Sequence, residues 1–270
     1  MLDDAQINAF IEDGFVRIDE AFPREIADEC RGIIWRDIDA DPHDPATWPR
    51  PVITRPDYAH EPFRAAANTP RLHAAFDDLV GPGRWTPRTG LGGFVIRFPS
   101  AETAVIDTWH IDVSFPGDDL DAGSTDYMRW RANIESKDCA LRMFFLFSDV
   151  GDQDAPTRLR IGSHLDAARV LEPEGEAGLD ARELGRRAEA ATTHRPIAHA
   201  TGNAGDVYLC HPFLVHAGQP HHGTTPRFLG QPKLDPSQPL DLDRRDGAFS
   251  PVEIAIRRGR GRTRNGRRQG

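Results

Sequence analysis

The stretch "GDVYLCHPFLVHAGQP" (residues 205–220) decides the fold class. It contains two short apolar runs, 206–210 and 212–217, which are separated at His211 and bounded by glycine and proline. Runs of about four to eight residues that are rich in β-branched and aromatic side chains, with such boundaries, are typical of strands. A helix would need a longer segment with a period near 3.6 residues. We therefore predict two consecutive short strands here.

Similar runs recur after residue 90. They cover residues 92–98, 103–113, 139–150, 195–200 and 226–231. Many short strands punctuated by glycine and proline favour a β-sandwich or a barrel over an α/β fold. Two helices interrupt the strands, one with Ser163 as its N-cap and one near 178–190. The prediction is a mainly β core with flanking helices.

The first 90 residues have a different texture. Apolar residues at helical spacing predict helices, which cover residues 4–13 (ended by Gly14), 24–38 and 69–81. Residues 41–62 contain six prolines, so we expect a long irregular loop there, and such loops are often functional. A last helix is expected at 250–258, with Ser250 as N-cap and Glu253 completing a capping box.

These segments indicate one domain over residues 1–256, with a helical part at 1–90 and a β core at 91–256. Residues 257–270 carry seven arginines and no acid, which predicts a basic, disordered tail. The net charge of −9 argues against a nucleic-acid-binding surface, so we expect no nucleic-acid partner.

Composition also indicates the compartment. The sequence has no apolar run of about 18 residues and no secretory leader at its N-terminus, so we expect neither a membrane span nor export. Three widely spaced cysteines favour a reducing compartment, and we expect a cytoplasmic protein.

A His-x-Asp pair lies in "TWHIDVSFPG" (residues 108–117), where a predicted strand runs into a turn. On a strand, residues two apart point to the same side, so His110 and Asp112 can converge on one cation. The pair His164 and Asp166 has the same spacing but lies at the start of a predicted helix, where such residues do not face each other. We therefore favour the first pair as metal ligands.

A mononuclear iron site of the facial-triad type needs a second imidazole from a distant segment. His211 and His216 are the two candidates. If residues 213–217 pair antiparallel with 226–230, His216 falls close to Arg227, and a buried arginine suits a carboxylate better than lysine does. This reasoning favours His216 on the metal and Arg227 on an organic acid.

The chain resembles the phytanoyl-CoA dioxygenase family of Fe(II)- and 2-oxoglutarate-dependent oxygenases. The resemblance extends over most of residues 5–257 and rests on "INAFIEDGFVRIDEAF", "TWHID", "DAPTRLRIGSH" and "GDVYLCHPFLVHAGQP". In that family the second histidine of H-x4-H binds the metal, and an arginine eleven residues later binds 2-oxoglutarate. His216 and Arg227 have this spacing.

The resemblance implies a double-stranded β-helix (jelly roll) with Fe(II) on His110, Asp112 and His216 and with 2-oxoglutarate on Arg227. It also implies that O2 and 2-oxoglutarate are consumed to hydroxylate an unactivated C–H bond of a small molecule, with release of succinate and CO2. Because related halogenases replace the carboxylate, Asp112 favours hydroxylation over halogenation.

Two positions depart from the family. The usual glycine before "PT" is Ala155 here. A hydroxyl residue often follows the distal histidine by two positions, and here that residue is Gly218. Thr157 or Tyr208 is expected to replace the missing contact, and Arg97 or Arg142 to line the pocket. Residues 41–62 and 114–135 are the expected lids. A cupin-like metalloenzyme that does not use 2-oxoglutarate, or a non-catalytic jelly-roll metal-binding protein, are the alternatives. The sequence does not select a substrate or an oligomeric state.

Overall fold

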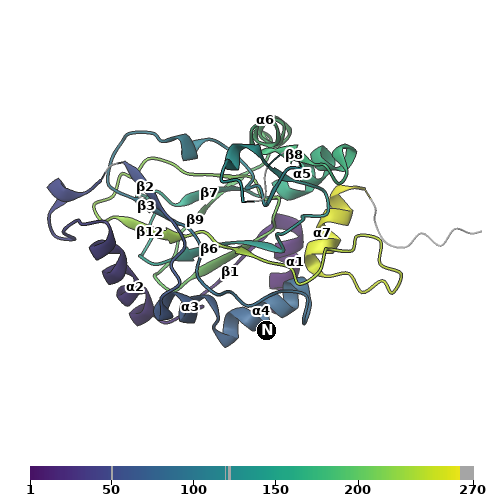
Figure 1. Ribbon diagram of the computed structural model, residues 1–270. Helices are drawn as coiled ribbons and strands as arrows, with labels where there is room; N and C mark the ends of the chain where they lie inside the picture. The colour runs from purple at the N-terminus through teal and green to yellow at the C-terminus, as the bar shows by residue number, and fades with distance from the viewer. Residues whose placement is uncertain (50, 119, 121–122, 262–270) are drawn as a thin grey trace, which may run out of the picture.

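The computed structural model describes residues 1–49, 51–118, 120 and 123–261. Antiparallel sheets form the centre of the molecule, and helices surround them (Figure 1). The helices are α1 Asp4–Asp13, α2 Arg24–Asp37, α3 Glu61–Ala67, α4 Pro70–Val80, α5 Ser163–Leu171, α6 Ala181–Ala191 and α7 Pro251–Gly259.

The strands of the described chain are short. They are β1 Phe15–Ile18, β2 Val52–Arg55, β3 Phe94–Arg97, β4 Phe115–Pro116, β5 Trp130–Ala132, β6 Leu141–Leu146, β7 Thr157–Arg160, β8 Leu179–Asp180, β9 Ile197–Ala200, β10 Val207–Cys210, β11 His216–Ala217, β12 Arg227–Gly230 and β13 Lys233–Leu234. The expected mainly β fold with flanking helices is confirmed.

The strands form three sheets. The large sheet has the order β1-β10-β6-β12-β3-β2, and β13 pairs with β6 beside this path. A second sheet has the order β11-β7-β9, and a small third sheet has the order β4-β5-β8. Neighbours in these sheets are mostly distant in the sequence, which is the arrangement of a jelly roll.

Strand β6 separates two apolar cores, because successive side chains on a strand point to opposite faces. Met143 and Phe145 belong to the larger core, beneath the helices. Phe144 and Leu146 belong to a smaller core, which Leu159 of β7 shares. The smaller core therefore lies between the large sheet and the β11-β7-β9 sheet, and Arg142 has the same parity as Phe144.

Aromatic rings attach the N-terminal helices to the large sheet. Phe63 of α3 lies edge-on to Phe94 of β3, with ring centroids 5.6 Å apart, and Phe147 lies 5.0 Å from both Phe94 and Phe22. All four rings are buried. The helical first part of the chain is thus packed on the outer face of the sheet and leaves the inner face for other residues.

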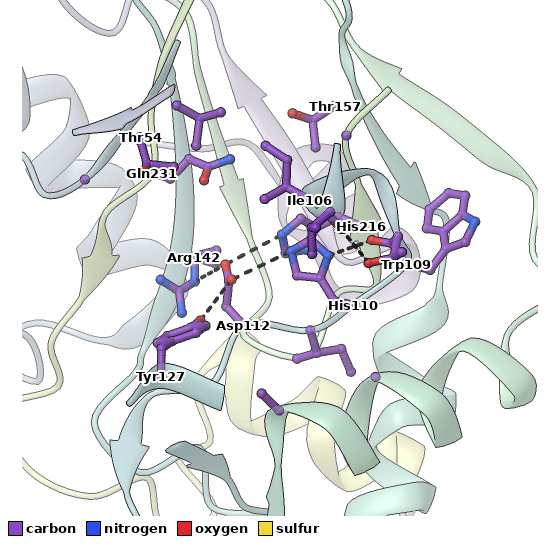
Figure 2. A pocket seen from close by; sticks show the side chains of 18 of the residues that line it. Thr54, Ile106, Trp109, His110, Asp112, Tyr127, Arg142, Thr157, His216 and Gln231 are labelled. Carbon is purple, nitrogen blue, oxygen red and sulfur yellow. Dashed lines mark hydrogen bonds and ion pairs between the residues drawn. The ribbon is translucent and has the colours of Figure 1, made fainter. Parts of the chain in front are cut away.

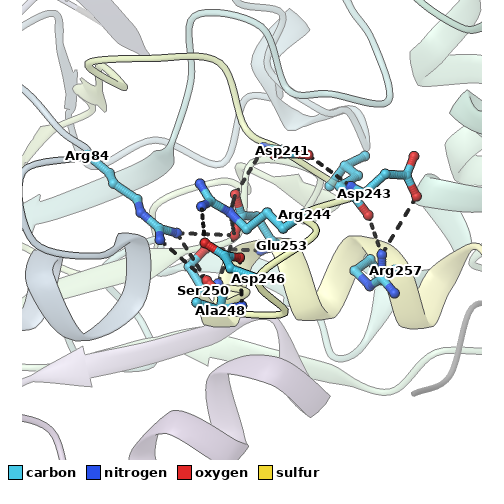
Figure 3. Close-up of polar contacts among 10 residues, drawn as sticks. Arg84, Asp241, Asp243, Arg244, Asp246, Ala248, Ser250, Glu253 and Arg257 are labelled. Atoms are coloured by element: carbon cyan, nitrogen blue, oxygen red, sulfur yellow. Dashed lines mark hydrogen bonds and ion pairs between the residues drawn. The ribbon is translucent and has the colours of Figure 1, made fainter. Parts of the chain in front are cut away.

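The C-terminal helix α7 is fixed by a buried carboxylate (Figure 3). Glu253 is only 1% exposed and accepts hydrogen bonds from the Ser250 and Asp241 backbone amides at 2.8 and 3.0 Å. The guanidinium groups of Arg244 and Arg84 lie 3.2 and 3.4 Å from its carboxylate oxygens. Ser250 caps the helix as predicted, and Glu253 also fixes the preceding loop.

Three local predictions are wrong. Residues 103–113 do not form a strand, because Asp107 accepts a hydrogen bond from the Ala104 amide at 2.8 Å and closes a 3-10 turn (η2, Val105–Asp107). The loop at 41–62 contains strand β2, which pairs with β3. Ser163 is the first residue of α5 rather than its N-cap, and its hydroxyl instead accepts a hydrogen bond from the Val215 amide.

The prediction placed the start of the tail too early, at residue 257. Residues 257–259 form the last turn of α7, and Arg260 pairs with Glu172 at 2.9 Å. The ordered part therefore extends past residue 256, because these arginines have acidic partners on neighbouring elements. Residues 262–270 of the expected tail lie outside the described residues. Within the described chain, no helix combines the length and the apolar character that crossing a bilayer requires.

Candidate metal centre

The two imidazoles come from segments that face each other through their backbones. The His110 amide donates to the His216 carbonyl, and the His216 amide donates to the His110 carbonyl, both at 3.0 Å. Residues that exchange both hydrogen bonds lie directly opposite each other. As a result, the ring centroids of His110 and His216 are only 4.4 Å apart.

Each imidazole is held in one tautomer. The Nδ1 of His110 lies 2.8 Å from the Thr108 carbonyl oxygen, and the Nδ1 of His216 lies 3.0 Å from the Leu214 carbonyl oxygen. A carbonyl only accepts, so both Nδ1 atoms carry the proton and both Nε2 atoms present a lone pair. This is the second sphere that metal-binding histidines usually have.

Asp112 completes the cluster. Its carboxylate oxygens lie 3.9 Å from the Nε2 of His110 and 3.6 Å from the Nε2 of His216. One potential ligand atom from each of the three residues lies within 4.8 Å of the others. Two imidazoles and one carboxylate on one side are the donor set of a facial-triad iron site, so these residues fit Fe(II).

Two further side chains orient the carboxylate (Figure 2). The Nε of Arg142 lies 3.0 Å from one oxygen of Asp112, and the Tyr127 hydroxyl donates to the other at 3.1 Å. Burial alone would raise the pKa of Asp112, but the attraction of Arg142 and of the two imidazoles outweighs it and holds the pKa well below its usual value. Asp112 is therefore an anion at neutral pH.

His216 has the complementary protonation state. Its side chain is 5% exposed, and burial lowers its pKa to about 4, with a further contribution from His110. Phe144 packs edge-on against the ring, at a centroid distance of 5.2 Å. A neutral imidazole beside an ionised carboxylate is the state that binds a divalent cation.

The cluster lies in a cavity of about 740 Å³, and Figure 2 shows its lining side chains. His110, Asp112 and His216 line it together with Arg227 and Thr157. Arg227 is 2% exposed, and its guanidinium donates to the Ala155 carbonyl oxygen. Its Nε has no hydrogen-bond partner in the described part of the chain. A buried cation with free donors facing a cavity is suited to a carboxylate ligand.

The predicted route that brings Arg227 to the site is wrong. β11, which carries His216, pairs with β7, whereas β12, which carries Arg227, pairs with β3 and β6. The two residues lie on different sheets and meet across the space between them. Arg227 lies on the same face of β12 as Leu229, which belongs to the smaller core. The alternation of side chains along the strand therefore directs the guanidinium between the two sheets.

Some of the residues predicted to line the pocket do so, and others do not. Thr157 is 4% exposed and lines the cavity. Arg97 does not line it, because Asp107 pairs with this buried guanidinium, with one contact at 3.4 Å. Tyr208 is also engaged elsewhere, since its hydroxyl donates to the Thr201 carbonyl oxygen at 2.6 Å. Of these two hydroxyl residues, Thr157 is the one that lines the cavity.

Close packing explains why residue 218 is a glycine. A Cβ atom at this position would lie 2.5 Å from Asp107 Oδ1 and 2.8 Å from Arg97 Nη2. The buried Arg97–Asp107 ion pair therefore occupies the space that a serine or threonine side chain would need. The absence of a hydroxyl side chain at position 218 is explained by that pair.

Both predicted lid segments contribute lining residues. Thr54 and Arg55 of β2 come from the proline-rich segment, and Tyr127 and Met128 come from residues 114–135. Trp48 does not line the cavity, because it packs on Trp35 and Phe98. Trp109 does line it, with the guanidinium groups of Arg158 and Arg160 at 4.8 and 4.3 Å from its ring.

Tyr127 and Arg142 were not predicted as partners of Asp112. Arg142 had a sequence signal, because it is the one charged residue in the run "CALRMFFLF" at 139–147 and alternates with buried neighbours. We expected it to line the pocket, which it does, but there it pairs with Asp112. Tyr127 had no sequence signal, since it lies in an irregular segment 15 residues beyond its partner.

Comparison with known proteins supports the fold. No family model matches the chain, and no curated protein matches its sequence. HygX from Streptomyces hygroscopicus, crystallised with nickel and 2-oxoglutarate, is similar in structure, with a TM-score of 0.55 at 19% identity over 88% of both chains. The epimerase SnoN from nogalamycin biosynthesis, in complex with Fe3+, alpha ketoglutarate and nogalamycin RO, gives 0.56 at 17% identity over 84% of this chain and 81% of that chain.

These similarities show that the chain has the jelly-roll fold of proteins whose structures hold iron or nickel and 2-oxoglutarate. At such low identity they concern the fold alone. The chemistry of this chain follows from its own cluster and cavity.

Proposed function

We propose that this protein is an Fe(II)- and 2-oxoglutarate-dependent oxygenase that hydroxylates an unactivated C–H bond of a small molecule. The observation that carries this proposal is the joint occurrence, in one cavity, of the His110–Asp112–His216 cluster and the buried Arg227. The cluster supplies the donor set for Fe(II), and the arginine supplies the cation for a dicarboxylate. We also propose that it belongs to the phytanoyl-CoA dioxygenase family, whose motifs its sequence resembles.

Each residue has a defined role in the proposed reaction. His110, Asp112 and His216 would hold the metal through two Nε2 atoms and one carboxylate oxygen. Fe(II), 2-oxoglutarate and O2 would together supply the oxidising chemistry that breaks a C–H bond, with succinate and CO2 as by-products. Arg227 would bind the distal carboxylate of 2-oxoglutarate, and the Thr157 hydroxyl would donate a hydrogen bond to the same molecule.

Arg142 and Tyr127 act on the protein side of the centre. Their contacts with Asp112 hold the carboxylate ionised and in one orientation before any ligand arrives. Such preorganisation lowers the reorganisation that metal binding requires. Because Asp112 is retained as a carboxylate, no ligand position is vacated for a halide, and hydroxylation is favoured over halogenation.

The alternative, a jelly-roll metal protein that does not use 2-oxoglutarate, leaves Arg227 without a function. A buried guanidinium is costly unless an anion offsets it, and no carboxylate pairs with Arg227 in the described chain. We further propose a reducing, cytoplasmic setting, which suits the three cysteines, all buried free thiols.

The test measures succinate formation by the purified protein with Fe(II), ascorbate, 2-oxoglutarate and O2, because these oxygenases also decarboxylate 2-oxoglutarate slowly without substrate. Under anaerobic conditions, addition of Fe(II) to the 2-oxoglutarate-loaded protein should give a visible charge-transfer band. His216→Ala should abolish both signals, whereas His199→Ala, on the exposed edge strand β9, should preserve them. The proposal is wrong if the wild-type protein gives neither signal.

A further inference from the structure

Apolar side chains gather at the mouth of the metal cavity. The described chain exposes five large hydrophobic side chains, and three of them line this cavity: Val105 at 89%, Tyr127 at 44% and Met128 at 52%. They come from two separate 3-10 turns, η2 and η3 (Tyr127–Arg129). Exposed apolar side chains that gather in this way mark a binding surface rather than chance exposure.

Helix α6 forms another wall of the same cavity. Its lining residues recur three to four positions apart and therefore lie on one face: Ala181, Arg182, Gly185, Arg186 and Glu189. Position 185 on this face lies beside the Trp109 carbonyl. The middle of this face has no side chain, because Gly185 occupies it.

Packing does not require a glycine at position 185. Outside its own helix, the one described atom within 4 Å of an ideal Cβ atom there is the Trp109 carbonyl oxygen, at 3.9 Å. That distance is ordinary van der Waals contact. Gly218 is the opposite case, since its Cβ atom would clash with Asp107.

Glycine in a helix interior is unfavourable compared with alanine. Gly185 thus keeps open a space beside the peptide between Trp109 and the metal ligand His110, at some cost to helix stability. The packing around position 185 gives no reason for that space.

The charge of the lining indicates which ligand enters. Five arginines and two acids line the cavity, although the whole protein carries a net charge of −9. Arg142 is paired with Asp112, Arg55 with Asp37 at 3.0 Å, and Arg186 with Glu183 at 2.6 Å. Arg182 makes no hydrogen bond or ion pair within the described residues. A cleft with an excess of one sign concentrates ligands of the opposite charge.

We propose that α6 walls the primary-substrate subsite, that Gly185 provides the room for the apolar body of the substrate, and that Arg182 binds a negatively charged group at its other end. This inference rests on the proposed function, because it assigns Arg227 to 2-oxoglutarate and leaves Arg182 for the substrate. The substrate class is therefore an amphipathic small molecule with one anionic end.

The binding experiment uses anilinonaphthalene sulfonate, which combines an apolar body with one anionic group. Its fluorescence is followed with the anaerobic protein saturated with Fe(II) and 2-oxoglutarate. We expect decanoate to displace this probe at a concentration at least about tenfold lower than decyltrimethylammonium does, since one favourable charge contact gives a difference of that order. Arg182→Gln should remove this preference.

Substitutions of Gly185 then test whether the space beside this residue is needed for binding. Gly185→Leu should weaken probe binding at least about tenfold, because overfilling a packed contact has an effect of this size. Gly32→Leu is the matched control, since Gly32 is also inside a helix (α2), and the one described atom beyond that helix backbone near its ideal Cβ atom is Arg36 Nη1 at 3.7 Å. Both Gly185→Ala and Gly32→Ala should raise the melting temperature by about 2 °C.

The outcomes separate the two proposals. If Gly185→Leu binds the probe as tightly as the wild type, or if decyltrimethylammonium competes as well as decanoate, the substrate-class inference is overturned even when the charge-transfer band is normal. If the band is missing but the probe binds and Gly185→Leu excludes it, the proposed function fails while the subsite stands. Retention of the band in Gly185→Leu is the expected sign that 2-oxoglutarate binds elsewhere in the cavity.

Discussion

Replacement of Arg227 by methionine should separate ligand binding from folding. The change removes the guanidinium group and keeps a long, unbranched apolar side chain. Burial, together with the like charge of Arg97, lowers the pKa of Arg227 from its usual value to about 9, and Asp107 offsets only part of this effect. Because the unfolded chain holds this proton more tightly than the folded protein, the charge opposes folding at neutral pH.

The magnitudes follow from these contacts. Arg227→Met loses one hydrogen bond to the Ala155 carbonyl oxygen, worth about 1 kcal/mol, and gains relief from an uncompensated buried charge. We expect the free energy of unfolding to change by less than about 1 kcal/mol. Loss of two charge-assisted hydrogen bonds should weaken 2-oxoglutarate binding by about 3 kcal/mol, which is roughly 100-fold.

The assays are urea unfolding and anaerobic titration of the Fe(II)-loaded protein with 2-oxoglutarate. Arg97→Met is the matched control, since Arg97 lies opposite Arg227 in the β3–β12 register and is equally buried. It should lose roughly 3–5 kcal/mol of stability, because Asp107 keeps a buried charge without its partner. An affinity of Arg227→Met within about threefold of the wild type, or a loss of stability as large as that of Arg97→Met, would refute the reasoning.

Four further variants test the centre and the fold. Asp112→Asn should weaken Fe(II) binding by more than about 100-fold in calorimetric titration while circular dichroism is unchanged, and Tyr127→Phe by up to about tenfold; equal effects would contradict the roles given to them. Burial lowers the pKa of His164 to about 4, so protonation of the unfolded state should reduce stability by about 2 kcal/mol between pH 6.5 and pH 5. His164→Gln should make this decline in stability less steep. Part of the decline should remain, because the buried His211 ring, 4.8 Å away, also has a lowered pKa. An unchanged slope would contradict the role given to His164. Glu253→Gln should cost roughly 1–3 kcal/mol in urea unfolding, and a smaller loss would mean that its arginine partners are satisfied by water.

Local signals in the sequence were sufficient for most helices and for about half of the strands. Gly14 ends α1 with a φ of 90°, and Ser250 begins α7 with the predicted capping box. Such signals work because the hydrogen bonds they describe join residues three or four positions apart. The prediction failed at residues 103–113, where the Asp107 side chain competes with the sheet for the backbone.

Candidate ligands were also visible in the sequence, because a facial triad requires particular residue types in a particular order. His110 and Asp112 were selected on this basis. His216 was preferred to His211 because of an assumed strand pairing with Arg227, which the structure does not contain, and because of the family spacing. The structure brings His110, Asp112 and His216 together. The role expected for Arg97 was wrong, since its partner Asp107 lies in a segment that the sequence placed in a strand.

By itself, the sequence determined which residues could serve as ligands, where most helices begin and end, and which strand positions share a face. Only the tertiary structure decided that β11 joins β7 instead of β12, that Tyr127 reaches Asp112, and that α6 presents Gly185 to the cavity. The physical reason is that the alternation of a strand specifies its two faces but not its neighbour. The neighbour is selected by the sum of many contacts between segments far apart in the chain, and no short stretch of sequence contains that sum.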